Sequence, residues 1–135
     1  MIIVVDASVA LQWVLPETNS EAAIALRSEQ LIAPVFWLLE AANALWRRHR
    51  RGEFSAIQAG TRLLELSEAP VASIPIEPHI NAALQLAARL GHPVYDCLYL
   101  AVAIQHNAHV VTADRRFAAL ADQPGFTDRV RLLGA

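Results

Sequence analysis

The sequence predicts an α/β protein with three layers, in which a central, mostly parallel sheet lies between two layers of helices. Strand-like and helix-like segments alternate along the 135 residues, which is the order expected when helices connect parallel strands. The first strand-like segment, Ile2–Val5, is a continuous apolar run, typical of a strand covered by helices on both faces. No repeat, linker or low-complexity segment interrupts the chain, so residues 1–135 are expected to form a single domain.

Prolines, glycines and serines indicate where the elements begin and end. Pro34 is expected to start the longest helix and Gly52 to end it, while Gly91 ends a later helix. Ser8 and Ser55 are placed to cap two further helices through their hydroxyl groups. The predicted strands are Ile2–Val5, Leu31–Ala33, Val71–Ile76, Val110–Thr112 and Val130–Leu133. The predicted helices cover residues 9–15, 19–28, 34–51, 56–67, 78–90, 94–104 and 115–121.

The helix that follows Pro93 is almost entirely apolar, yet its first turn carries Asp96. A helix that is apolar all round is expected to be buried on most sides. The next strand then delivers Asp114 at its carboxyl end. A buried carboxylate is costly unless it is paired, hydrogen-bonded or bound to a metal, so the two acids call for a common explanation.

The composition excludes several classes of function. All eleven positively charged residues are arginine, and the formal net charge is −2. Without lysine the chain cannot form a P-loop, a Schiff base or the lysine site of a receiver domain. The single cysteine, Cys97, excludes an internal disulfide and a zinc site built from neighbouring thiolates, and we expect it to be buried. No apolar run approaches the roughly 20 residues of a membrane span, and no basic leader precedes Asp6, so we expect a soluble, cytoplasmic protein without membrane contact.

Four of the thirteen acidic residues interrupt apolar segments or strand ends: Asp6, Glu40, Asp96 and Asp114. Each of them alone could simply cap a helix or pair with an arginine. In open parallel sheets, however, ligands bind beyond the carboxyl ends of the strands, and two of these acids follow strands. Four carboxylates in one crevice would raise one another's pKa unless cations neutralised them, and oxygen ligands favour Mg²⁺ or Mn²⁺ over zinc. The pattern therefore predicts a metal site that could activate a water for attack on a phosphodiester.

These acids also carry a resemblance to a known family. Asp6 after the first strand, Glu40 with Asn43 one turn later, Asp96 in Tyr-Asp-Cys-Leu-Tyr-Leu-Ala, and Thr112-Ala-Asp114 resemble a PIN domain. More narrowly, the chain resembles a VapC-type toxin of a toxin–antitoxin pair. The resemblance spans residues 2–117.

The resemblance implies a Mg²⁺- or Mn²⁺-dependent endoribonuclease that cleaves structured RNA such as tRNA or rRNA. Asp6, Asp96 and Asp114 would hold the metal, while Glu40 would bind through water or orient the attacking water. The small polar residues of the family, which would hydrogen-bond the acids, fall on Ser8, Asn43 and Thr112. Arg116 stands where some relatives carry a further acid, so the number of metal ions stays open.

The resemblance further implies a cognate VapB-type antitoxin, whose extended tail places a basic side chain near the acids, and a homodimer. Two arginine groups are candidates for contact with RNA phosphates. They are Arg47, Arg48, Arg50 and Arg51 at the end of the helix that carries Glu40, and Arg115 and Arg116 beside Asp114. The alternative for the first group is a solvated helix end whose positive charges favour the helix dipole.

Other interpretations remain open. The chain could be a non-catalytic PIN scaffold that binds RNA or protein, or a housekeeping RNA-processing nuclease. A phosphatase or receiver-like domain is disfavoured, because Ser8 stands where a second aspartate would be needed and lysine is missing. The five histidines show no metal-ligand spacing and are predicted to be non-catalytic. Trp37 and Trp46 lie nine residues apart and are expected on different faces of one helix.

Overall fold

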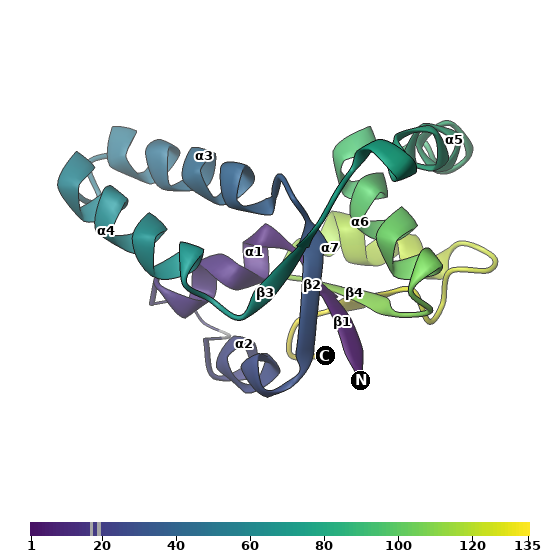
Figure 1. Ribbon diagram of the computed structural model, residues 1–135, viewed down its shortest axis with the longest axis horizontal. Coiled ribbons are helices and arrows are strands. Elements are labelled where there is room, and N and C mark those ends of the chain that lie inside the picture. The colour runs from purple at the N-terminus through teal and green to yellow at the C-terminus, as the bar shows by residue number, and fades with distance from the viewer. Residues whose placement is uncertain (17, 19) are drawn as a thin grey trace.

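A computed structural model describes residues 1–16, 18 and 20–135. Within these ranges, five parallel strands form one sheet in the order β3-β2-β1-β4-β5 (Figure 1). The strands are β1 (Ile2–Val5), β2 (Gln30–Pro34), β3 (Val71–Ile74), β4 (His109–Thr112) and β5 (Val130–Leu132). The parallel sheet predicted from the alternating pattern is therefore confirmed.

Helices connect the strands and cover the sheet. They are α1 (Ala7–Ala10), α2 (Ser20–Ala25), α3 (Trp37–Arg50), α4 (Ala56–Ser67), α5 (Ile80–Leu90), α6 (Val94–Gln105) and α7 (Arg115–Ala118). Short 3₁₀ segments cover Leu11–Trp13, Leu26–Ser28, Glu77–His79 and Ala119–Asp122. Figure 1 shows α3 packed beside α4 on one side of the sheet's carboxyl edge, and α5 beside α6 on the other. None of the helices in the described ranges is long and apolar enough to cross a membrane.

Several predicted boundaries are confirmed together with their physical cause. Ser55 caps α4 through a capping box: its Oγ accepts from the Gln58 backbone amide at 3.1 Å, and its own amide donates to Gln58 Oε1 at 2.8 Å. Gly52 and Gly91 follow α3 and α5 with φ of +80° and +63°, a backbone conformation that favours glycine.

Other boundaries were predicted wrongly. Ser8 does not cap the first helix, because α1 already begins at Ala7 and Asp6 occupies the cap position. Pro34 ends β2 instead of starting a helix, since a proline is tolerated at the end of a strand, and α3 begins at Trp37. The strand predicted to reach Ile76 ends at Ile74. The predicted start of the second helix at Asn19 lies outside the described residues.

The core forms where the central strand β1 and its neighbour β4 meet α6. Val4, Val5 and Val110 are fully buried, and every residue of α6 from Cys97 to Ala103 is buried. The expectation of a helix buried on most sides, with a buried cysteine, is therefore confirmed. α6 contacts both of these strands.

Candidate active site

Three elements bring acidic residues to the carboxyl edge of the sheet. Asp6 directly follows β1, Glu40 lies in the first turn of α3, and Asp96 lies in the first turn of α6. β1 and β4 pair in parallel, with Val5 opposite Val111, so both strands end at this edge. The backbone amide of Asp6 donates to the Val111 carbonyl at 3.1 Å, which fixes where Asp6 leaves the sheet.

Asp6 is buried and held by two hydroxyl groups from different segments. Its Oδ2 accepts hydrogen bonds from Ser8 Oγ and Thr112 Oγ1, each at 2.7 Å. The two hydroxyls also accept backbone amides, of Ala113 and Asp114 respectively, each at 3.0 Å. Burial raises the pKa of Asp6 and the charge of a neighbouring acid raises it further, although the two hydroxyls act in the opposite direction. The carboxyl is therefore held firmly in one orientation, in surroundings that disfavour its charge.

Glu40 is half-buried and linked to α6 by a tyrosine. Tyr99, which is fully buried, donates its hydroxyl to Glu40 Oε1 at 2.6 Å. Burial raises the pKa of Glu40 to about 7, and the charges of Asp6 and Asp96 contribute in the same direction. Burial also raises the pKa of Tyr99, so the tyrosine stays a neutral donor. Without a bound cation, the surroundings of Glu40 therefore disfavour its charged form.

Asp96 completes this acidic group. It is half-buried, and its Oδ2 lies 2.6 Å from Nε2 of His92. Its charge raises the pKa of both Asp6 and Glu40. The three carboxyls therefore form one electrostatic unit, which we call the acidic triad (Asp6, Glu40 and Asp96).

Asp114 stands apart from the acidic triad. It is exposed, and its Oδ1 accepts from the backbone amides of Arg116 at 2.8 Å and Phe117 at 3.4 Å, which makes it the N-cap of α7. Its charge is not among those that raise the pKa of Asp6 or Glu40. The structure thus gives Asp114 a clear helix-capping role, alongside its position at the same edge of the sheet.

The predicted set of three metal ligands is not assembled in the structure. Within the described ranges, no group of three or more His, Cys, Asp or Glu side chains is close enough together to hold a metal ion as it stands. The chemistry of the donors nevertheless fits a hard cation. The charge of Asp96 raises the pKa of Asp6 and of Glu40, and the charge of Asp6 raises that of Glu40 further. No arginine among the described residues forms an ion pair with Asp6, Glu40 or Asp96. Mg²⁺ or Mn²⁺ would supply the positive charge that this site lacks.

The remaining predicted residues lie at different distances from the triad. Asn43 is exposed on α3 and borders, together with Glu40 and Tyr95, a hollow of about 360 Å³. Arg115 and Arg116 are exposed on α7, directly after Asp114.

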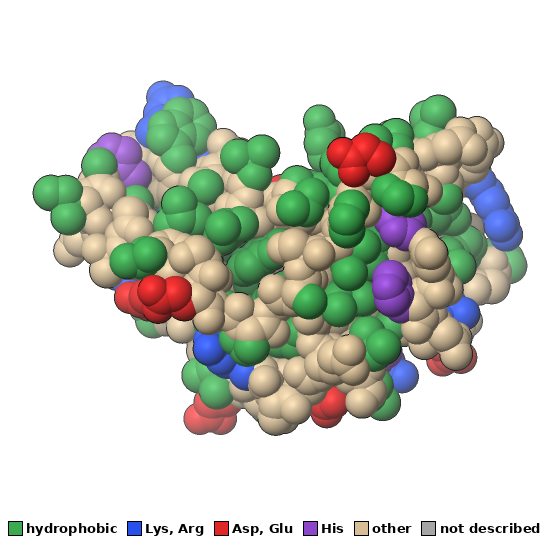
Figure 2. All heavy atoms as spheres, in the orientation of Figure 1, with side chains coloured by type: hydrophobic (Ala, Val, Ile, Leu, Met, Phe, Trp, Pro, Cys, Tyr) green, Lys and Arg blue, Asp and Glu red, His purple; other side chains and the backbone are tan. Residues whose placement is uncertain are grey.

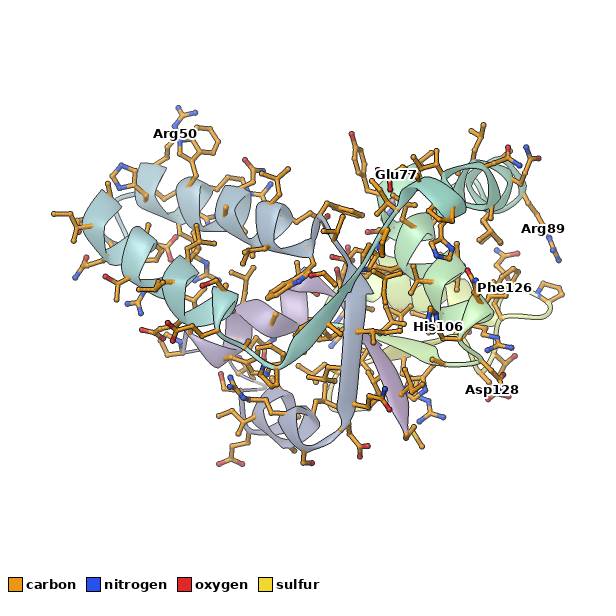
Figure 3. All side chains as sticks on the ribbon, viewed as in Figure 1. Arg50, Glu77, Arg89, His106, Phe126 and Asp128 are labelled. Carbon is orange, nitrogen blue, oxygen red and sulfur yellow. The ribbon has the colours of Figure 1, made fainter. Side chains whose placement is uncertain are left out.

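The other arginines lie at the far end of α3. Arg50 is ten residues beyond Glu40, which is roughly 15 Å along a helix that rises about 1.5 Å per residue. Arg50 lies over the ring of Trp46, while Arg48 and Arg51 pair with Glu53. Figure 3 labels Arg50 at the outer end of α3, and Figure 2 shows positively charged and histidine side chains there. The structure does not bring this group to the acids.

Two residues that contact the triad were missed by sequence reasoning. His92 contacts Asp96 and Tyr99 contacts Glu40, although the histidines were predicted to be non-catalytic and the tyrosine was given no role. His92 lies four residues before Asp96 and Tyr99 three residues after it. The spacing of Tyr99 places it on the same face of α6 as Asp96, which the sequence could have indicated, whereas His92 precedes the helix and no helical pattern indicates it.

Comparisons with known proteins agree with the parallel α/β fold. The family model of the PIN domain matches residues 3–123. Ribonuclease VapC3 from Pyrobaculum aerophilum is 32% identical over 123 residues, covering 87% of this chain and 93% of that protein. A crystal structure of a Pyrobaculum aerophilum protein matches with a TM-score of 0.73 at 25% identity, covering 96% of this chain and 83% of that one. A toxin–antitoxin complex from Klebsiella pneumoniae contains the same fold, with a TM-score of 0.66 at 17% identity over 96% of this chain and 95% of that one.

Proposed function

This chain belongs to the PIN-domain family and is similar to VapC ribonucleases, and we propose that it is a metal-dependent endoribonuclease that acts as the toxin of a toxin–antitoxin pair. The observation that carries the proposal is the acidic triad. Three carboxyls lie at the carboxyl edge of a parallel sheet, and neighbouring carboxylates raise the pKa of two of them, Asp6 and Glu40, without a compensating arginine among the described residues. Such an arrangement is costly for folding and is explained by a bound cation.

Asp6 and Asp96 would hold Mg²⁺ or Mn²⁺. Asp114 would be a third ligand through Oδ2, because its Oδ1 caps α7. When bound, such an ion lowers the pKa of a coordinated water and stabilises the oxygen that leaves the phosphodiester. Ser8 and Thr112 keep Asp6 in one orientation through hydrogen bonds to its Oδ2. Asn43, one turn beyond Glu40, is placed to hydrogen-bond groups that enter the neighbouring hollow.

Glu40 would accept the proton of the attacking water. Without a cation its pKa is about 7, and a bound cation would favour the ionised form that can accept a proton. Tyr99 fixes Glu40 Oε1 and leaves Oε2 for the water. In-line attack on the phosphate would then leave a 5′-phosphate and a 3′-hydroxyl.

The substrate would be a structured RNA such as tRNA or rRNA, cleaved in the cytoplasm. A relative named as a ribonuclease supports RNA as the substrate class. Arg115 and Arg116 are the arginines best placed to contact its phosphates, since they directly follow Asp114. The group at the end of α3, Arg47, Arg48, Arg50 and Arg51, would contact RNA farther from the cleaved bond.

The partners would be a VapB-type antitoxin and a second copy of the chain. A toxin–antitoxin complex among the structural neighbours supports the first. Expression of the chain alone should arrest growth, and co-expression of the product of the adjacent gene should relieve the arrest. Normal growth with active cleavage in vitro would favour a housekeeping nuclease instead.

The test is cleavage of total RNA by the purified, antitoxin-free chain with Mg²⁺ or Mn²⁺. We expect discrete products that disappear with EDTA and with Asp96→Asn. Asp128→Asn is the matched control, because Asp128 is an exposed acid that borders a hollow with His106 (Figure 3) and with Met1 and Ile2 at the amino end of β1. Cleavage that survives Asp96→Asn would contradict the assignment. Absence of both cleavage and metal binding would leave a scaffold that binds RNA or protein.

A further inference from the structure

We propose that His92 is a positioning residue for Asp96. Its imidazole Nε2–H holds Oδ2 of the carboxylate, so that Oδ1 is the oxygen presented to a divalent cation. The inference rests on the proposed function, since it concerns the same acidic triad, and it adds a residue to which neither the sequence nor the comparisons gave a role.

The contact is short and the segment that carries it is well held. Nε2 of His92 lies 2.6 Å from Asp96 Oδ2. The histidine sits between Gly91, whose φ is +63°, and Pro93, the N-cap of α6. The amides of Gly91 and His92 both donate to the Ala87 carbonyl, at 2.9 and 3.3 Å. The backbone at His92 is therefore fixed by the end of α5 on one side and by a proline ring on the other.

The imidazole is also held by its surroundings. His92 is only 8% exposed, and its ring packs on Phe117 of α7 with the ring centroids 5.7 Å apart. Because an ionised carboxylate only accepts hydrogen bonds, the contact with Asp96 requires the proton to sit on Nε2. The protein therefore holds both the position of the ring and the nitrogen that carries its proton.

The same arrangement recurs at each of the four acids. Oδ2 of Asp6 is held by two hydroxyls, Oε1 of Glu40 by a tyrosine hydroxyl, and Oδ1 of Asp114 by backbone amides. For Asp96 the donor is His92, and among the described residues no other donor contacts this carboxylate. One oxygen of each acid is thus engaged by the protein. Without this contact, an aspartate in a first helical turn could rotate or bind nearby backbone amides. His92 thus fixes the carboxylate in advance, and a cation does not have to order it on binding.

Two variants separate this role from simple packing. His92→Phe keeps a ring against Phe117 but removes the donor. His92→Gln keeps an amide donor near the position of Nε2 but removes the ring. If His92 only filled space, the phenylalanine variant would behave like the wild type and the glutamine variant would be impaired. If His92 positions Asp96, His92→Phe would be the impaired variant and His92→Gln would behave more like the wild type.

The measurement is the affinity for Mn²⁺, by isothermal titration calorimetry of the purified full chain without RNA. We expect His92→Phe to bind Mn²⁺ about 10- to 100-fold more weakly, as is typical when the hydrogen-bond partner of a ligand is removed, and His92→Gln to bind more tightly than His92→Phe. His79→Phe, at another buried histidine, is the matched control and should leave the affinity unchanged. Thermal unfolding in EDTA checks that each variant is folded. Unchanged affinity in His92→Phe, or a loss in His92→Gln as large as in His92→Phe, would overturn the proposal.

A second measurement does not depend on the folding of a His92 variant. Nitrogen NMR shifts of the wild-type imidazole should show a proton on Nε2, and Asp96→Asn should change them. A proton on Nδ1 with a bare Nε2 would overturn the proposal. Failure of the wider proposal looks different: the wild type would then bind no Mn²⁺, and RNA cleavage would not depend on Asp96.

Discussion

Asp6 and Asp114 follow neighbouring parallel strands at the same edge of the sheet, yet they differ in burial and in hydrogen-bond partners. Asp6 is buried, accepts two side-chain hydroxyls and has a raised pKa. Asp114 is exposed and accepts the backbone amides of the helix that it caps. A position at the end of a strand therefore does not by itself give an acid unusual chemistry. Burial and neighbouring charges do so, and they act on Asp6 and Glu40.

The largest expected effect comes from removing the charge of Asp6. Asp6→Asn keeps the shape of the side chain but removes a ligand and a charge, which we expect to lower the rate of RNA cleavage roughly 10³-fold, equivalent to about 4 kcal/mol of transition-state stabilisation. Asp114→Asn should lose less, because its side chain lies outside the triad and its amide oxygen can still cap α7. Single-turnover cleavage of one mapped RNA measures both. Equal losses of cleavage rate in the two variants would show that the two acids contribute equally to catalysis, against this account.

A smaller effect is expected from the link between α6 and α3. Tyr99→Phe removes one oxygen atom and should keep the edge-on ring contact with Phe36, so we expect a folded protein with cleavage reduced about tenfold. The hydrogen bond from Tyr99 lowers the pKa of Glu40, so its removal should raise that pKa above its present value of about 7.

The direction of the pH effect follows from the role of Glu40 as a base. Glu40 must be ionised to accept a proton, so activity should rise with pH through its pKa, and this rise should lie at higher pH in Tyr99→Phe than in the wild type. The pH profile of the cleavage rate measures the shift. A lower rate with an unchanged pH profile would show that Glu40 does not accept the proton.

The smallest effects should distinguish the two arginine groups. Arg115→Ala with Arg116→Ala should reduce the slope of log affinity for RNA against log salt by about one for each phosphate that the variant no longer binds. Arg50→Ala with Arg51→Ala, far along α3, should change the slope less, since Arg50 lies over Trp46 and Arg51 pairs with Glu53. Binding of an uncleaved RNA by the Asp96→Asn protein at several salt concentrations provides the measurement. A larger change of slope in the Arg50/Arg51 variant than in the Arg115/Arg116 variant would show that RNA binds mainly at the end of α3.

The sequence predicted those parts of the molecule that depend on local patterns. An apolar run followed by an acid located β1 and Asp6, a serine and a glycine located the start of α4 and the end of α3, and the apolar helix α6 was expected to be buried. These features follow from the periodicity and chemistry of neighbouring residues. The resemblance then related Asp6, Glu40 and Asp96, which are far apart in the chain and which the structure brings into one electrostatic unit.

What escaped prediction depends on how elements pack. Ser8 looked like a helix cap, but its hydroxyl instead joins Asp6 to the segment after β4, a contact across 105 residues of sequence. Tyr99 looked like one more core residue of α6, because only its packing against α3 shows that the hydroxyl reaches Glu40. His92 lies before α6, and the turn at Gly91 and Pro93 that directs it to Asp96 is not visible in a helical pattern.

The central claim is that the acidic triad exists to bind a cation, and proton release on metal binding tests it most directly. Asp6 and Glu40 have raised pKa values, so a bound cation should displace protons from them near neutral pH. Calorimetric titration of Mn²⁺ in buffers with different ionisation enthalpies counts these protons. We predict release at about pH 6.5 that is much smaller at about pH 8.5 and is reduced in Glu40→Gln. Binding without proton release at either pH, or no binding of Mn²⁺, would contradict the account.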